Sequence, residues 1–351
     1  MSGDYRGLAD HRHRDGWTFR PDAELPSPAV ADAAGSAEGA AGRAPALRPD
    51  FVIIGAQKSA STFLHYCLSQ HPEVYVRPGE TPIFEDPDFA AYHPGSFAAM
   101  FRGRTEGCLG IRRPNYMGRS EAAPRIGEIL PDAKLIAVLR NPVDRAVSCA
   151  HHQMVESFIP LMNIEECMRQ ALAGELQRRY PRAWQILEFG LYYRSLRLYQ
   201  SFLDRGRLLV IDQARFLNDK ETVLGEVFAF LGVDAGFVPA DLASRKQPGH
   251  YHPVSQRLAR LANAISHRRD DDNLRAHPRG LPARMVGRGV KQAANIVEAA
   301  LAAGGRPQLS AACRAELYAY YRDDIENLER LLGWDCSAWQ PREEALRPEA
   351  A

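Results

Sequence analysis

The sequence lacks an apolar run long enough to cross a membrane, and its first residues lack the apolar core of a signal peptide. Its 6 cysteines are scattered and form neither a Cys-x-x-Cys pair nor a Cys/His cluster with metal-ligand spacing. The 44 basic and 43 acidic side chains nearly cancel, which gives no support for a nucleic-acid-binding role. These absences predict a cytoplasmic protein from a reducing compartment, with no metal centre, no nucleic-acid partner and no transmembrane segment.

Composition divides the chain into three parts. Residues 1–48 are rich in Ala, Gly, Pro, Asp and Arg without a sustained apolar period, which predicts a disordered leader. We expect one folded domain over residues 49–340, followed by a tail over residues 341–351. Within the domain, residues 255–304 are rich in arginine, amphipathic and broken at Pro278 and Pro282. We expect a helical insertion there, which would form a lid, a partner-binding face or a solvated segment.

Short apolar runs alternate with helical segments along the predicted domain. Residues 51–54, 74–76, 134–139 and 207–212 have the pattern of buried strands. Residues 160–205 have a helical pattern, and a last helix over 309–332 ends at Gly333, a typical helix C-cap residue. Strands that alternate with helices predict an α/β fold with a parallel central sheet.

The first strand leads into a candidate phosphate-binding loop. Gly55 ends the strand, and the small polar residues that follow lead into a helix N-terminus, where free N–H groups and the helix dipole favour an anion. Lys58 adds a charge, and Ser59, Ser61 and Thr62 add hydroxyl donors. The spacing is not that of nucleoside-triphosphatases, because only two residues separate Gly55 from Lys58 and no Gly precedes the lysine. The alternative is an ordinary helix start with a solvated lysine.

Other charged residues follow strands, at the edge of an α/β sheet where ligands bind. Glu80 follows residues 74–76, and Arg112 and Arg113 lie near the end of another apolar segment. Arg140 follows the strand 134–139, and a helix that starts at Asn141–Pro142 would bring Ser148 to the same ligand. The alternatives are a surface carboxylate, a solvated arginine pair and a structural arginine–aspartate pair.

Three of these segments together resemble the sulfotransferases that use 3′-phosphoadenosine 5′-phosphosulfate (PAPS). Residues 55–62, Gly-Ala-Gln-Lys-Ser-Ala-Ser-Thr, resemble their 5′-phosphosulfate loop, and residues 139–148 resemble their 3′-phosphate motif. Residues 327–339 resemble the end of many bacterial members. The resemblance covers residues 50–340, and it is closer to the carbohydrate (heparan-type) branch, in which a glutamate precedes an aromatic turn as Glu80 precedes Phe84 here.

This resemblance implies a P-loop-like central parallel sheet flanked by helices, with PAPS as co-substrate and no metal. It implies that Glu80 is the general base and that Lys58 holds the 5′-phosphosulfate. The other implied cofactor-binding residues are Ser59, Ala60, Ser61, Thr62, Arg140, Ser148, Lys246, Gly249, His250 and Tyr251. Arg112 and Arg113 are the candidate acceptor-binding residues. Four positions depart from the family. Ala60 replaces the common glycine, and Pro248 and His250 replace the usual basic residues. Pro82 lies where some heparan enzymes have histidine, so we do not expect their acceptor to be the acceptor of this protein.

The sequence therefore predicts an enzyme that moves a sulfuryl group from PAPS to an acceptor hydroxyl by in-line transfer. We expect the acceptor to be a small molecule or a glycan, such as a carbohydrate or a glycosylated or secondary metabolite. The alternatives are an ATP-dependent P-loop kinase and a non-catalytic nucleotide-binding scaffold. The oligomeric state and the sulfated position are not indicated by the sequence.

Overall fold

The computed structural model describes residues 47–340, except for residues 103, 105, 241, 243–248, 271–275 and 302–308. The predicted tail and all but two residues of the predicted leader lie outside these ranges, so the domain boundaries stay a proposal. The strands are β1 (Phe51–Gly55), β2 (Val74–Val76), β3 (Cys108–Arg112), β4 (Lys134–Leu139), β5 (Leu208–Asp212), β6 (His267–Arg269) and β7 (Ala276–Pro278).

Helices fill most of the chain between and after these strands. The α-helices are α1 (Ser61–Leu68), α2 (Ser96–Phe101), α3 (Ala122–Ile129), α4 (Pro142–Val155), α5 (Ile164–Leu172), α6 (Glu175–Arg179), α7 (Gln185–Glu188), α8 (Tyr192–Arg197), α9 (Gln200–Asp204), α10 (Gln213–Asn218), α11 (Lys220–Leu231), α12 (Pro253–Ser266), α13 (Leu281–Leu301) and α14 (Ala311–Leu332). The 3-10 helices are η2 (Asp88–Ala91), η3 (Tyr116–Gly118) and η5 (Ser337–Trp339). None of the helices in the described ranges is both long and apolar enough to span a bilayer.

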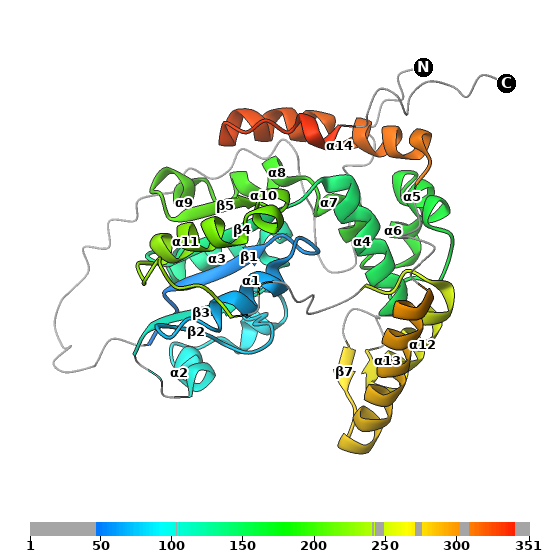
Figure 1. Cartoon of the computed structure of the whole chain (residues 1–351), viewed down its shortest axis with the longest axis horizontal. Coiled ribbons are helices and arrows are strands. Elements are labelled where there is room, and N and C mark those ends of the chain that lie inside the picture. Colours follow the sequence, from blue (N-terminus) through cyan, green and yellow to red (C-terminus); the bar gives the residue numbers. More distant parts are fainter. Residues whose placement is uncertain are drawn as a thin grey trace. The chain divides into compact units, whose positions relative to one another are not determined.

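The centre of the fold is a five-stranded parallel sheet in the order β2-β3-β1-β4-β5. β1 lies between β3 and β4, so the segments that follow these three strands meet at one edge of the sheet. Helices lie on both sides of the sheet (Figure 1). The predicted α/β class and parallel sheet are confirmed.

The side chains of the central strands alternate between two hydrophobic cores, as the two-residue period of a strand requires. On β1, Val52 and Ile54 face the core that contains α3, α4 and α14, whereas Phe51 and Ile53 face the core that contains α1 and α11. All four side chains are fully buried, because helices cover both faces of the sheet. This explains why β1 has a continuous apolar sequence.

The helical prediction for residues 160–205 is only partly right. The segment forms five short helices, α5 to α9, separated by turns. Gly174 adopts a positive φ of 73° directly before α6, and Leu191 has a non-helical backbone directly before α8. The breaks leave room for the aromatic side chains of this segment to pack in several directions, which one straight helix would not allow.

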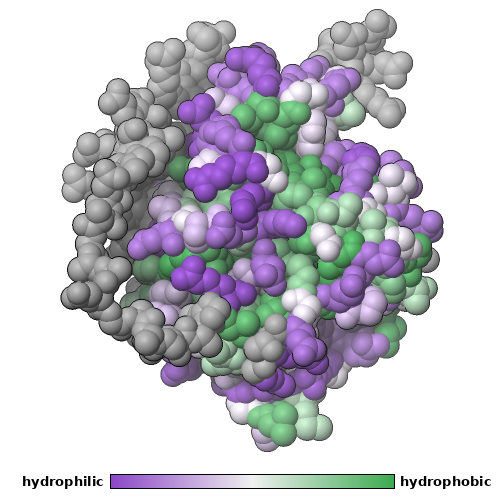
Figure 2. All heavy atoms as spheres, turned by 90° about the vertical axis from the view of Figure 1, so that its left-hand side faces the viewer, coloured by the Kyte–Doolittle hydropathy of each residue, from purple (hydrophilic) through white to green (hydrophobic). Residues whose placement is uncertain are grey.

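The predicted insertion over residues 255–304 contains a helical hairpin. α12 and α13 pack against each other, and the short antiparallel pair β6–β7 lies between them in the sequence (Figure 1). Pro278 ends β7 and Pro282 lies in the first turn of α13, where proline is well tolerated. On the face of the molecule seen in Figure 2, hydrophilic residues surround scattered hydrophobic areas, as is normal for a folded protein.

Candidate functional site

The segment from β1 to α1 forms the predicted strand–turn–helix. Ala60 is the N-cap residue of α1, and its carbonyl accepts hydrogen bonds from Phe63 N over 2.9 Å and Leu64 N over 3.0 Å. No side chain caps this helix, so the N–H groups of Ser61 and Thr62 at the helix start are available to an anion. Lys58 and Ala60 have positive φ values of 68° and 70°, which curl the turn tightly.

Lys58 lies inside this turn and is half-buried. Burial lowers the pKa of its ammonium below the ordinary value of 10.5, and the nearby charge of Arg140 lowers it further. Glu156 and Glu80 act in the opposite direction. The Lys58 ammonium makes no hydrogen bond or ion pair with any residue that the structure describes. An anionic ligand would supply the missing partner.

Arg140 brings the second predicted segment to this loop. It follows β4 directly, and its Nη1 donates to the backbone carbonyl of Lys58 over 3.4 Å. α4 begins at the next residue but one, with Asn141 as N-cap accepting from Val143 N over 3.0 Å. The predicted helix start is therefore correct. Asp144 pairs with Arg314 at 3.0 Å instead of with an arginine on its own segment.

Ser148 lies on α4 and is half-buried. Its neighbour Cys149 donates its Sγ–H to Gln57 Oε1 over 3.1 Å, so this turn of α4 packs against the loop that contains Lys58. The structure describes no hydrogen bond of the Ser148 hydroxyl with the loop or with Arg140. The predicted joint role of Arg140 and Ser148 stays a proposal.

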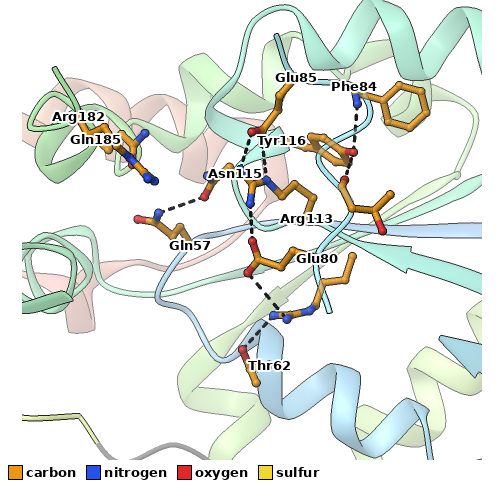
Figure 3. Close-up of polar contacts among 12 residues, drawn as sticks. Gln57, Thr62, Glu80, Phe84, Glu85, Arg113, Asn115, Tyr116, Arg182 and Gln185 are labelled. Carbon is orange, nitrogen blue, oxygen red and sulfur yellow. Dashed lines mark hydrogen bonds and ion pairs between the residues drawn. The ribbon is translucent and has the colours of Figure 1, made fainter. Parts of the chain in front are cut away.

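Glu80 contacts two arginines, one of which connects it to the start of α1. Its side chain is 40% exposed, with Oε2 at 2.6 Å from Arg113 Nη1 and Oε1 at 3.8 Å from Arg112 Nη2 (Figure 3). Arg112 also donates to Thr62 Oγ1 over 2.9 Å. The carboxylate is thus linked to the first turn of α1 by one guanidinium. Arg112 and Arg113 are not a solvated pair, because both hold this carboxylate.

Two residues of the site were not predicted from the sequence. Glu85 is 3% exposed and accepts two hydrogen bonds from Arg113, at 2.7 Å and 2.6 Å, which fix the guanidinium that contacts Glu80. Gln57 donates to Asn115 Oδ1 over 3.0 Å and so connects the loop to the segment after β3 (Figure 3). Neither residue has a local pattern that distinguishes it from a surface polar residue. Only the strand order places their partners beside them.

The predicted adenosine-side loop is held by the helical hairpin. Glu298 of α13 accepts hydrogen bonds from Tyr251 N at 3.1 Å and 3.0 Å, and the Tyr251 ring packs edge-on against His151 of α4 at 5.1 Å. His250 is 9% exposed, and burial lowers the pKa of its imidazole. Tyr251 therefore lies close to α4, one helical turn beyond Ser148, and Gly249 and His250 directly precede it in the chain. Lys246 lies outside the described residues.

The charges of four cations from different segments act on His152 of α4. Burial lowers the pKa of its imidazole well below the ordinary value of 6.5, and the charges of Lys58, Arg182, Lys291 and Arg269 lower it further. The guanidinium carbons of Arg182 and Arg269 each lie 3.9 Å from the centre of the Phe158 ring. The helical hairpin thus adds positive charge to the neighbourhood of the loop, which favours an anion there.

The backbone of Ala60 makes one stability prediction. An L-residue at a φ of 70° is strained, which costs about 1–2 kcal/mol, whereas glycine is not strained there. Glycine also loses about 0.4–1 kcal/mol more backbone entropy on folding. We therefore expect Ala60→Gly to stabilise the protein by about 0.5–1 kcal/mol in urea unfolding. Destabilisation would show that the Ala60 methyl group makes a contact worth more than the strain.

The fold places Lys58 and the uncapped start of α1 where the central strands of a parallel sheet end, the edge at which α/β proteins bind their ligands. The model of the sulfotransferase domain family matches residues 48–245, more than half of the chain. The chain belongs to the sulfotransferase family, a family of transferase enzymes.

Individual relatives agree with this family. The chain is 29% identical over 201 residues to mouse bifunctional heparan sulfate N-deacetylase/N-sulfotransferase 4, covering 53% of this chain and 22% of that protein. It is 30% identical over 190 residues to mouse heparan sulfate glucosamine 3-O-sulfotransferase 6, covering 53% of this chain and 52% of that protein. The chain thus spans about half, or less, of the length of these relatives.

A solved sulfotransferase from Alicyclobacillus acidocaldarius has a similar fold. Its TM-score is 0.57 at 24% identity, and the match covers 84% of this chain and 99% of that structure. The predicted family, including its likeness to the heparan-type branch, and the predicted fold are confirmed.

Proposed function

We propose that the chain transfers a sulfuryl group from PAPS to an acceptor hydroxyl, with Glu80 as general base. The observation that carries the proposal is the contact of Arg140 with the backbone of Lys58, because it joins the two segments that resemble the phosphosulfate and 3′-phosphate motifs. Glu80 is connected to the same loop through Arg112 and Thr62. The proposed base Glu80, the loop that contains Lys58 and the Arg140 guanidinium are therefore connected to one another.

The residues present fit this co-substrate. The half-buried Lys58 ammonium and the uncapped start of α1 suit the 5′-phosphosulfate. Arg140, with Ser148 on the following helix, suits the 3′-phosphate, and residues 249–251 suit the adenosine side. When bound, PAPS supplies the sulfuryl group and 3′-phosphoadenosine 5′-phosphate is released.

Each residue would have a distinct task during transfer. Lys58 and the N–H groups at the start of α1 would stabilise negative charge on the leaving oxygens. Glu80 would accept the proton of the acceptor hydroxyl, and its ion pairs with Arg112 and Arg113 would hold the carboxylate in position. Glu85 would act as a positioning residue, because it orients Arg113.

The acceptor that the site favours is a hydroxyl of a carbohydrate or a glycosylated metabolite that carries an anionic group. The carbohydrate is supported by both relatives, whose names specify heparan sulfate, and the hydroxyl is supported by the relative named a 3-O-sulfotransferase. The anionic group is supported by the charges of Arg182, Arg269 and Lys291, which act on His152 of α4 together with the charge of Lys58. The cytoplasmic location stays a prediction from the sequence.

The test is calorimetric titration with 3′-phosphoadenosine 5′-phosphate. We expect metal-independent binding that Arg140→Ala weakens about 10- to 100-fold, because hydrogen bonds to charged groups contribute about 1.5–3 kcal/mol. Arg140→Lys should keep part of the affinity, and Arg178→Ala, which removes an exposed arginine of α6, should keep all of it. Binding of ATP with Mg²⁺ in preference to this ligand would overturn the proposal in favour of a kinase.

A further inference from the structure

Exposed hydrophobic side chains are concentrated on the helical hairpin of α12 and α13. Among the residues that the structure describes, nine large hydrophobic side chains are markedly exposed, and seven of them lie on these two helices. They are Val254, Leu261, Leu281, Met285, Val286, Ile296 and Leu301. Met285 and Ile296 are each 62% exposed, which is unusual for large apolar residues of a well-formed helix.

These side chains are not used to hold the hairpin together. The two helices pack through small residues, since Ala259, Ala262, Gly287 and Ala294 are buried between them. A Cβ at Gly287 would lie 1.8 Å from Ser266 Oγ, so no larger residue fits at this crossing.

The geometry of α13 places its large apolar residues away from this seam. At about 100° per residue, Leu281, Met285 and Ile296 share one side of the helix, roughly opposite Gly287 and Ala294. Leu281, Met285 and Ile296 therefore form an apolar stripe that faces solvent. This stripe has no packing partner among the residues that the structure describes.

Cations lie beside this stripe. Arg284, Arg288 and Lys291 are exposed and follow one another at intervals of one helical turn along α13. Arg257, Arg268 and Arg279 add exposed positive charge on the rest of the hairpin. The described acidic residues of the hairpin are Asp270 and Glu298, and Glu298 is buried and bound to the Tyr251 backbone. The exposed charge of the described hairpin is therefore strongly positive.

We propose that the hairpin face, made of Leu281, Met285 and Ile296 with the row Arg284, Arg288 and Lys291, binds the surface of an anionic lipid bilayer. An apolar stripe bordered by arginine and lysine is the arrangement of a helix that lies in the membrane interface. The apolar side chains enter the headgroup boundary, and the cations meet the anionic headgroups. A second copy of the chain fits this face poorly, because two such cationic rows would repel each other.

The experiment is vesicle flotation of the full chain. We expect the protein to float with vesicles of phosphatidylcholine mixed with phosphatidylglycerol, much less with phosphatidylcholine alone, and less at high salt, because salt screens the charges. Absence of binding to the mixed vesicles at low salt would overturn the proposal. Self-association through this face in the absence of lipid, abolished by Met285→Ser, would also overturn it.

Paired variants separate the two contributions to membrane binding. Met285→Ser with Ile296→Ser should remove most of the binding, whereas the matched control Leu217→Ser with Val238→Ser changes two exposed apolar residues elsewhere and should leave it intact. Arg284→Gln with Arg288→Gln should weaken binding about 25-fold, at about 5-fold for each charge. The control Arg178→Gln with Arg179→Gln removes the same number of positive charges, but from α6 instead of the hairpin. Equal binding by the hairpin variants and their controls would contradict the proposal.

The outcome is independent of the proposed sulfuryl transfer. All four double variants should bind 3′-phosphoadenosine 5′-phosphate as the wild type does, because none of these residues lies in the proposed site. Retained nucleotide binding also shows that the variants are folded.

Discussion

Glu80→Gln is expected to lower kcat about 10²–10⁴-fold, because the amide has the shape of the carboxylate but does not accept the proton of the acceptor hydroxyl. Affinity for 3′-phosphoadenosine 5′-phosphate should change little, since Lys58 and Arg140 remain in place. The measurement is single-turnover transfer from PAPS, combined with titration of the product nucleotide. Unchanged turnover in Glu80→Gln would remove the general-base role.

A control must separate proton transfer from positioning, because Glu80 also holds Arg113 at 2.6 Å. Arg113→Lys keeps the positive charge and the Glu80 carboxylate but loses the planar fork that binds Glu80 and Glu85 together. If Glu80 is the base, this variant should lose far less activity than Glu80→Gln. Equal losses would show that Glu80 acts only by orienting the arginine.

The sequence predicted the sheet because the information is local. A short run such as Phe51-Val52-Ile53-Ile54 is apolar on both faces, which only a strand covered by helices on both sides satisfies. The start of α4 was predicted from equally local information, because Asn141 caps the helix and Pro142 suits its first position. The family motifs were found because they lie in these strand–loop–helix segments.

The contacts that fix the site side chains are not local. Glu85 and Arg113 are 28 residues apart, and Gln57 and Asn115 are 58 residues apart. Their meeting depends on β3 lying directly beside β1, which no single segment specifies. Likewise, the hydrogen bond from the Tyr251 N–H to Glu298 joins residues that are 47 positions apart, and it depends on how α13 packs on α12.

Lys58→Met is expected to lower kcat/KM about 10²–10³-fold, the loss typical of removing one preorganised group that stabilises transition-state charge. Methionine keeps the length of the apolar stem, so the loss reports the ammonium itself. The same variant should be more stable than the wild type by about 0.5–2 kcal/mol without ligand, because a half-buried ammonium that has no described counter-ion is removed. The matched control is Lys220→Met at the start of α11, which should change neither quantity.

The pH dependence gives an independent test of the same residue. The pKa of Lys58 is lowered in the folded protein, mainly by burial, so between that lowered pKa and 10.5 the unfolded chain keeps a proton that the folded chain has released. Stability without ligand should therefore rise with pH across this window in the wild type, relative to Lys58→Met. Binding of 3′-phosphoadenosine 5′-phosphate should weaken across the same window, because the anion needs the charged ammonium. If both proteins show the same pH dependence in urea unfolding and in titration, Lys58 is not the cation that holds the 5′-phosphate. If the wild type and Lys58→Met differ in both measurements, the Lys58 ammonium destabilises the free protein and stabilises the bound anion.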